Sequence, residues 1–135
     1  MRQFLFIINL FLFCSCSHSL EGGFVNPKLS SKWTLTDVQA PGYGPSGIWS
    51  VASPVGRWFQ FNADSTVSGT VFTGATRYSI LDSATLKIII PTEAVGFKLY
   101  NYQLDSINRV LYFYLRPPNG GYCFEGCGTL KFKSQ

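Results

Sequence analysis

The sequence predicts an all-β protein, a small antiparallel up-and-down barrel of about eight strands without substantial helix. Short segments rich in β-branched and aromatic residues recur along residues 29–135, and most of them alternate with period two. Turn-forming residues separate these segments, and most connections are too short for crossovers, so neighbouring strands are expected to pair antiparallel. A sheet of this size has to hide its edges, which favours closure into a barrel over a two-sheet sandwich.

The first expected strand carries Trp33 and Leu35 on one face, and the later segments repeat this alternation with aromatic and branched side chains. The expected strands cover residues 32–36, 57–62, 66–72, 77–81, 85–90, 97–104, 109–115 and 129–133. Residues 29–135 are therefore predicted to form one domain.

The first 15 residues predict an export signal. Met1-Arg2-Gln3 carries one positive charge, and an apolar run broken only by Asn9 follows from Phe4 to Phe13. The run is too short to span a bilayer, which takes roughly 20 apolar residues. Small Ser15 stands directly before Cys16, where a signal peptidase would cut.

The sequence Phe13-Cys14-Ser15-Cys16 resembles the lipobox of bacterial lipoproteins. That resemblance implies that Cys16 is diacylated, becomes the first residue of the mature protein, and is then N-acylated by a chain such as palmitate. Each buried CH₂ adds about 0.8 kcal/mol, so several acyl chains form a stable membrane anchor. The alternative is an ordinary signal peptide with Cys16 as an incidental thiol, but an unpaired cysteine in an exported protein favours lipidation.

Residues 16–28 are expected to be a flexible tether between the lipid and the domain. The only histidine, His18, lies there, which argues against a catalytic or metal-binding role because such roles need a rigid scaffold. Without Arg2 the net charge falls from +4 to +3, and the basic residues are scattered, so no nucleic-acid partner is predicted. We expect a monomer in the bacterial cell envelope, extracytoplasmic and anchored by lipid to a membrane, with the outer membrane favoured over the inner.

The connection from Gln39 to Gly56 is long, rich in glycine and proline, and contains Tyr43 and Trp49. Loops of this length in small domains are usually functional or partly disordered. One interpretation is a flap over the barrel mouth; the other is a further edge strand at residues 48–51 with Trp49 in the core. The sequence favours neither.

Four short motifs, taken in order, resemble the lipocalin-like lipoproteins of Bacteroidota-type bacteria. They are Lys32-Trp33-Thr34-Leu35, Gly42 to Trp49, Phe61 to Gly69, and Cys123 to Cys127. The resemblance spans about residues 29 to 133, nearly the whole mature domain. It implies a lipocalin-like barrel and binding of a small apolar ligand.

Cys123 and Cys127 are expected to form a structural disulfide, since the protein is predicted to be exported. So short a loop contributes about 2 kcal/mol by chain entropy. A metal site would need two more ligands, and a redox motif usually has two residues between its cysteines. Neither a metal nor a cofactor is predicted.

No catalytic constellation is recognisable, so we predict that the protein is not an enzyme. The domain has no histidine to act as a base. Its carboxylates lie mostly in turns or at strand ends, where aspartates usually accept hydrogen bonds from nearby backbone N–H groups. These carboxylates are Asp37, Asp64, Asp82, Glu93, Asp105 and Glu125.

Two hypotheses about function remain. In the first, the barrel holds a small hydrophobic ligand, contacted by aromatic side chains whose hydroxyls are polar tips in an apolar cavity. In the second, the barrel is filled, and outward aromatics bind a protein or glycan of the cell envelope. The candidate binding residues are Tyr43, Trp49, Trp58, Tyr100, Tyr102, Tyr112 and Tyr114. Core packing explains most of these residues under either hypothesis, and an interior cavity of several hundred Å³ would favour the first.

Overall fold

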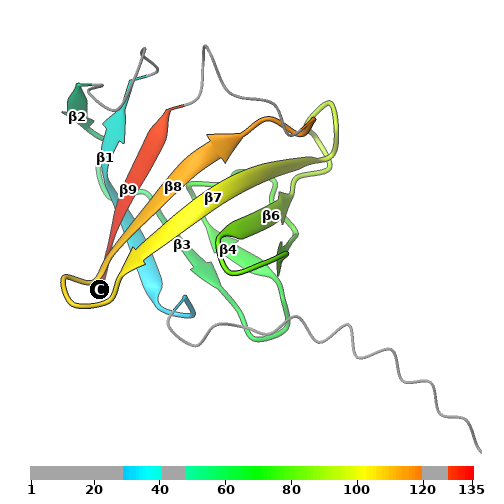
Figure 1. Ribbon diagram of the computed structural model, residues 1–135, viewed down its shortest axis with the longest axis horizontal. Coiled ribbons are helices and arrows are strands. Elements are labelled where there is room, and N and C mark those ends of the chain that lie inside the picture. The colour runs from blue at the N-terminus through cyan, green and yellow to red at the C-terminus, as the bar shows by residue number, and fades with distance from the viewer. Residues whose placement is uncertain (1–28, 41–47, 120–127) are drawn as a thin grey trace, which may run out of the picture.

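The computed structural model describes residues 29–40, 48–119 and 128–135, and these ranges are all-β (Figure 1). Its strands are β1 Lys32–Gln39, β2 Trp49–Val51, β3 Trp58–Phe61, β4 Val67–Gly69, β5 Arg77–Ile80, β6 Thr85–Ile89, β7 Phe97–Asp105, β8 Val110–Arg116 and β9 Thr129–Ser134. Within these ranges no helix is present that could cross a membrane. The signal peptide, Cys16, the tether, Tyr43 and the cysteine pair Cys123–Cys127 lie outside the described residues.

The strands form an antiparallel, up-and-down barrel that is nearly closed, as predicted. Their order in the sheet is β4-β3-β1-β9-β8-β7-β6-β5, so the first strand pairs with the last. The two ends of this order meet at a narrow seam, through an isolated bridge between Thr66 and Arg77. The backbone N–H of Tyr78 also donates to the carbonyl of Ser65 there, at 2.9 Å.

β2 is the edge strand that one interpretation of the long connection expected. It pairs with the end of β1, where Asp37 faces Val51 and Gln39 faces Trp49. The expectation that Trp49 fills the core is wrong, because its side chain is 41% exposed on the outer wall. Paired only with the last residues of β1, β2 has no inner face to bury.

The expected strand at 66–72 is shorter than predicted, because the chain turns at Gly69. Gly69 has φ +122°, and a Cβ there would collide with the carbonyl oxygen of Trp58. The N–H groups of Thr70 and Val71 both donate to that same carbonyl, at 2.7 and 3.2 Å. This turn carries Phe72 inward, where it is buried.

A β-bulge in β1 sets which of its residues face inward. The register against β9 shifts between Leu35 and Asp37. Leu35 is buried before the bulge, and Val38 packs against the core after it. Asp37 therefore turns outward, where Lys131 Nζ lies 3.5 Å from its Oδ2.

Packed aromatic rings fill the centre of the barrel. Phe113 on β8 is fully buried, with ring centroids 5.5 Å from Phe59, 5.4 Å from Tyr100 and 5.2 Å from Phe132. We call this group the ring cluster: Phe59, Phe61, Phe72, Tyr100, Phe113 and Phe132. An eight-stranded barrel is just wide enough for such side chains, so open space is left only toward its ends.

Candidate functional site

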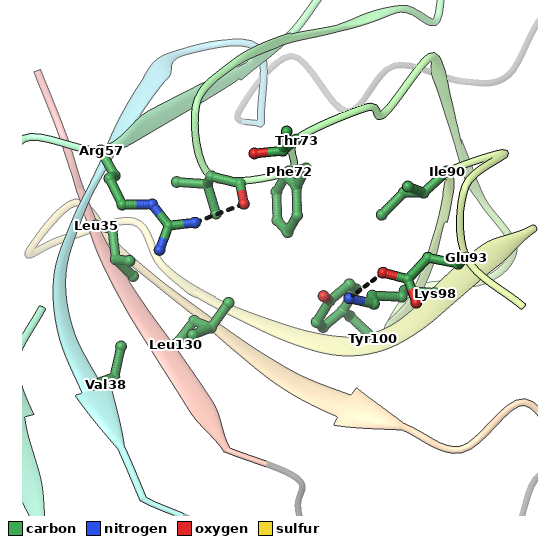
Figure 2. Close-up of a pocket in the computed structure, with 11 residues that line it drawn as sticks. Leu35, Val38, Arg57, Phe72, Thr73, Ile90, Glu93, Lys98, Tyr100 and Leu130 are labelled. Atoms are coloured by element: carbon green, nitrogen blue, oxygen red, sulfur yellow. Dashed lines mark hydrogen bonds and ion pairs between the residues drawn. The ribbon is translucent and has the colours of Figure 1, made fainter. Parts of the chain in front are cut away.

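A pocket of about 320 Å³ opens at one end of the barrel, above the ring cluster (Figure 2). β1 ends here and β3, β7 and β9 begin here, so residues distant in sequence share one rim. We call it the mouth pocket. Its lining comprises Leu35, Val38, Arg57, Val71, Phe72, Thr73, Ile90, Glu93, Lys98, Tyr100 and Leu130.

The floor of the mouth pocket is apolar. The buried rings of Phe72 and Tyr100 lie 5.8 Å apart, and Leu35 and Ile90 are buried beside them. Burial, and then the nearby charge of Glu93, raise the pKa of the Tyr100 hydroxyl. Tyr100 therefore stays neutral at physiological pH and can both donate and accept a hydrogen bond.

The rim of the mouth pocket is charged. Arg57 Nη2 donates to the backbone carbonyl of Val71 at 2.9 Å. On the opposite wall, Lys98 Nζ lies 2.7 Å from Glu93 Oε1. Figure 2 shows these groups facing one another across the pocket, with Phe72 between them. The Glu93–Lys98 pair is more than a third exposed, so it contributes little to stability. Its two opposite charges nevertheless cancel each other at the rim.

A smaller pocket of about 190 Å³ lies at the opposite end of the barrel. Trp33 and Leu104 line it together with Ser31, Ser106, Arg109 and Ser134. The Trp33 ring is 2% exposed, and its Nε1 donates to the carbonyl of Leu29 at 3.1 Å. This ring closes the barrel bottom, so the smaller pocket is a surface recess and we favour the mouth pocket as the site.

The predicted aromatic binding residues fall into different places. Tyr100 lines the mouth pocket, and Tyr102 packs against the core on the same inner face without lining it. Trp58 lies half-buried on the outer wall, with Lys32 Nζ 4.6 Å from its ring centroid. On β8 the buried residues are Leu111 and Phe113, so the tyrosines of this strand face outward.

Three of the remaining candidates gather on the outer wall of the barrel. We call this group the outer aromatic patch: Trp49, Tyr112 and Tyr114. The rings of Trp49 and Tyr112 meet edge to face at 6.2 Å. Tyr114 is 39% exposed, and Lys131 Nζ lies 5.9 Å from the Trp49 ring centroid. This patch is separated from the mouth pocket by the thickness of the sheet.

Sequence reasoning missed the charged residues of the rim. Arg57 opened an expected strand, which places it at a barrel end, but nothing local indicates which other residues share that end. Glu93 lies in the connection between β6 and β7, and Lys98 is the second residue of β7. Opposite charges this close in sequence around a hairpin connection are a weak signal for an ion pair. Their assembly with Arg57 depends on barrel closure.

Among the described residues, no group of three or more histidine, cysteine or acidic side chains could hold a metal ion. The turn aspartates Asp64, Asp82 and Asp105 accept hydrogen bonds from nearby backbone N–H groups, as expected of such positions.

Comparisons with protein-family models, with curated proteins and with solved structures returned no match to this chain.

Proposed function

We propose that this chain is a lipoprotein of the bacterial cell envelope that binds a small hydrophobic ligand in the mouth pocket. The observation that carries the proposal is a recess of about 320 Å³ with a buried aromatic floor and a few convergent polar groups. Ligand pockets typically measure about 300–1,000 Å³ and combine apolar walls with few polar groups. The resemblance of residues 13–16 to a lipobox, and the motifs resembling lipocalin-like lipoproteins, support the same proposal.

The filled barrel limits the size of this ligand. At about 30 Å³ for each non-hydrogen atom, the value for liquid water, the mouth pocket accommodates roughly ten such atoms. The ring cluster blocks deeper entry, because its central residues are completely buried. The proposed ligand is therefore a short-chain or single-ring compound, and a long-chain lipid would be left mostly outside.

The test is ligand-dependent thermal stabilisation of the chain from residue 20 onward, after cooperative unfolding has shown that this chain folds. Small aromatic and short-chain compounds are expected to raise the melting temperature in proportion to the logarithm of their concentration. Val38→Trp should abolish the effect by filling the mouth, while Val51→Trp on the outer wall should not. Absence of stabilisation by every compound, together with no co-purifying small molecule by mass spectrometry, would contradict the proposal.

The membrane anchor is tested separately. Mass spectrometry of the mature protein should find an acylated amino terminus at Cys16, and Cys16→Ala should release the protein from the membrane fraction. A mature terminus elsewhere, or an unmodified Cys16 thiol, would rule out this part of the proposal.

A second candidate function rests on the outer aromatic patch, where exposed rings stand beside the Asp37–Lys131 ion pair. Flat apolar faces next to polar groups suit a glycan of the cell envelope. Retention on isolated cell-wall polysaccharide should be lost in Trp49→Ala and kept in Trp58→Ala, which removes an outer-wall ring elsewhere. No retention of the unaltered protein would exclude this function.

A further inference from the structure

We infer that the mouth pocket selects small organic monoanions, with Arg57 holding the negative group and the aromatic floor holding the apolar body. This inference rests on the proposed function, since it names the chemical class of the ligand. It depends on the charges of the rim and on how each is compensated.

Arg57 supplies a cation that the described part of the chain does not neutralise. One terminal nitrogen is fixed by the Val71 carbonyl at 2.9 Å, which orients the guanidinium plane at the rim. Guanidinium has five N–H donors, so most of them remain for a ligand. No ion pair with Arg57 is present among the described residues. Figure 2 shows the group above Leu35, on the side of the pocket facing Phe72.

The other charged groups of the rim cancel. Lys98 Nζ and Glu93 Oε1 are 2.7 Å apart, so this pair presents almost no net charge to a ligand. The lining therefore carries one uncompensated positive charge, on Arg57. The charge stands next to a surface of buried rings, where the lower local dielectric strengthens its attraction for an anion.

A carboxylate matches these donors better than other groups of similar size. Two of its oxygens can accept parallel N–H bonds from one guanidinium, a geometry that an amide or alcohol cannot reproduce. Hydrogen bonds to charged groups are stronger than neutral ones, so a carboxylate should bind about tenfold more tightly than its amide.

The test measures binding of 3-phenylpropionate and 3-phenylpropanamide to the full mature chain in nanodiscs by calorimetry, with empty nanodiscs as the blank. The two compounds have nearly the same size and differ in charge. We expect about tenfold tighter binding of the carboxylate at low salt, with the difference shrinking at high salt because the pocket is open to solvent.

Two variants move the preference in opposite directions. Arg57→Gln should lower carboxylate affinity to that of the amide while leaving amide affinity unchanged. Glu93→Gln frees Lys98 and should raise carboxylate affinity severalfold. Lys131→Gln, which removes a cation from the outer wall, is the matched control and should change neither.

The outcomes separate the two claims. If neither compound nor any related small ligand binds, the proposed function fails. If both bind equally and Glu93→Gln leaves their ratio unchanged, binding at the mouth stands and the selection of anions is overturned. Should Arg57→Gln fail to fold, the response to Glu93→Gln alone decides the inference.

Discussion

At the scale of single residues, the interior is organised around Phe113. Its ring touches those of Phe59, Tyr100 and Phe132, which come from β3, β7 and β9. Aromatic pairs at such distances add about 0.5–1.5 kcal/mol each beyond the burial of their area. One side chain thus joins strands around the barrel and also supports the floor of the mouth pocket through Tyr100.

Phe113→Ala should destabilise the protein by about 3–5 kcal/mol, because it leaves a cavity among rings that cannot collapse into it. The free energy of unfolding from urea titration measures this loss. Ile107→Ala, at a side chain 91% exposed, is the control and should change stability by less than about 0.5 kcal/mol. Similar effects for the two variants would show that the ring cluster is not the core.

The turn aspartates are expected to make the free energy of unfolding decrease at acidic pH. Hydrogen bonds from the Ala84 N–H to Asp82 and from the Asn108 N–H to Asp105 lower the pKa of each carboxyl below 3.8. A depressed folded-state pKa means that the charged form stabilises the fold. This contribution is fully present well above pH 3.8 and is lost as pH falls toward the lowered folded-state pKa values.

We therefore expect the urea midpoint to be constant near neutral pH and to fall once pH drops below about 4. The double variant Asp82→Asn, Asp105→Asn should show a shallower fall, because asparagine does not titrate. Urea titrations of both proteins at pH 6 and pH 3 compare these losses. An equal loss in both proteins would assign the acid sensitivity to other groups.

At the scale of elements, short interruptions of regular strands build the mouth pocket. The bulge in β1 turns Val38 inward, and the turn at Gly69 directs Phe72 to the floor. At both places the residue that faces inward differs from the one that strict alternation along the strand would place there. The site thus depends on departures from the period-two pattern.

Gly69→Ala should cost about 3 kcal/mol or more, because a methyl group would strike the Trp58 backbone in addition to straining a positive φ. Gly56→Ala is the matched control: φ is +84°, but no atom lies within 4 Å of the new Cβ, so only about 1 kcal/mol is expected. Unfolding in urea compares them. Equal losses would mean that β3 and β4 are not in close contact at Gly69.

The strands themselves could be predicted from sequence, while the site could not. Alternation in 85–90, 97–104 and 109–115 located β6, β7 and β8 within a few residues. In 109–115, however, both faces carry large apolar side chains, so the pattern does not say whether Phe113 or Tyr112 points inward. Three-residue β2 is too short to show a period at all.

Residues of the mouth pocket are brought together by long-range pairing. Arg57 and Lys98 belong to different hairpins, and they share a rim because β1 pairs with both β3 and β9. Aromatic density drew attention to Tyr100, which lines the mouth pocket. It also drew attention to Trp49, Tyr112 and Tyr114, which lie outside, because strand-forming aromatics are equally suited to either face.

At the scale of the whole molecule, the protein is a barrel with a solid centre and a recess at one end. Apart from β2, which pairs only with β1 at its side, the strands follow one another around the barrel in chain order, and β1 pairs with β9. The narrow contact between β4 and β5 completes the ring. The solid centre confines any interior ligand to the mouth. Any ligand bound inside this barrel should therefore be a small compound held near the surface.

The most direct test of this account is the affinity of straight-chain alcohols, from butanol to dodecanol, for the soluble chain from residue 20 onward. Each added CH₂ that becomes buried contributes about 0.8 kcal/mol, roughly a fourfold gain in affinity. The account predicts that this gain continues to about nine carbons and then stops, because the mouth pocket is full and the ring cluster lies beneath it. A gain that continues undiminished to dodecanol, or no binding by any alcohol, would contradict it.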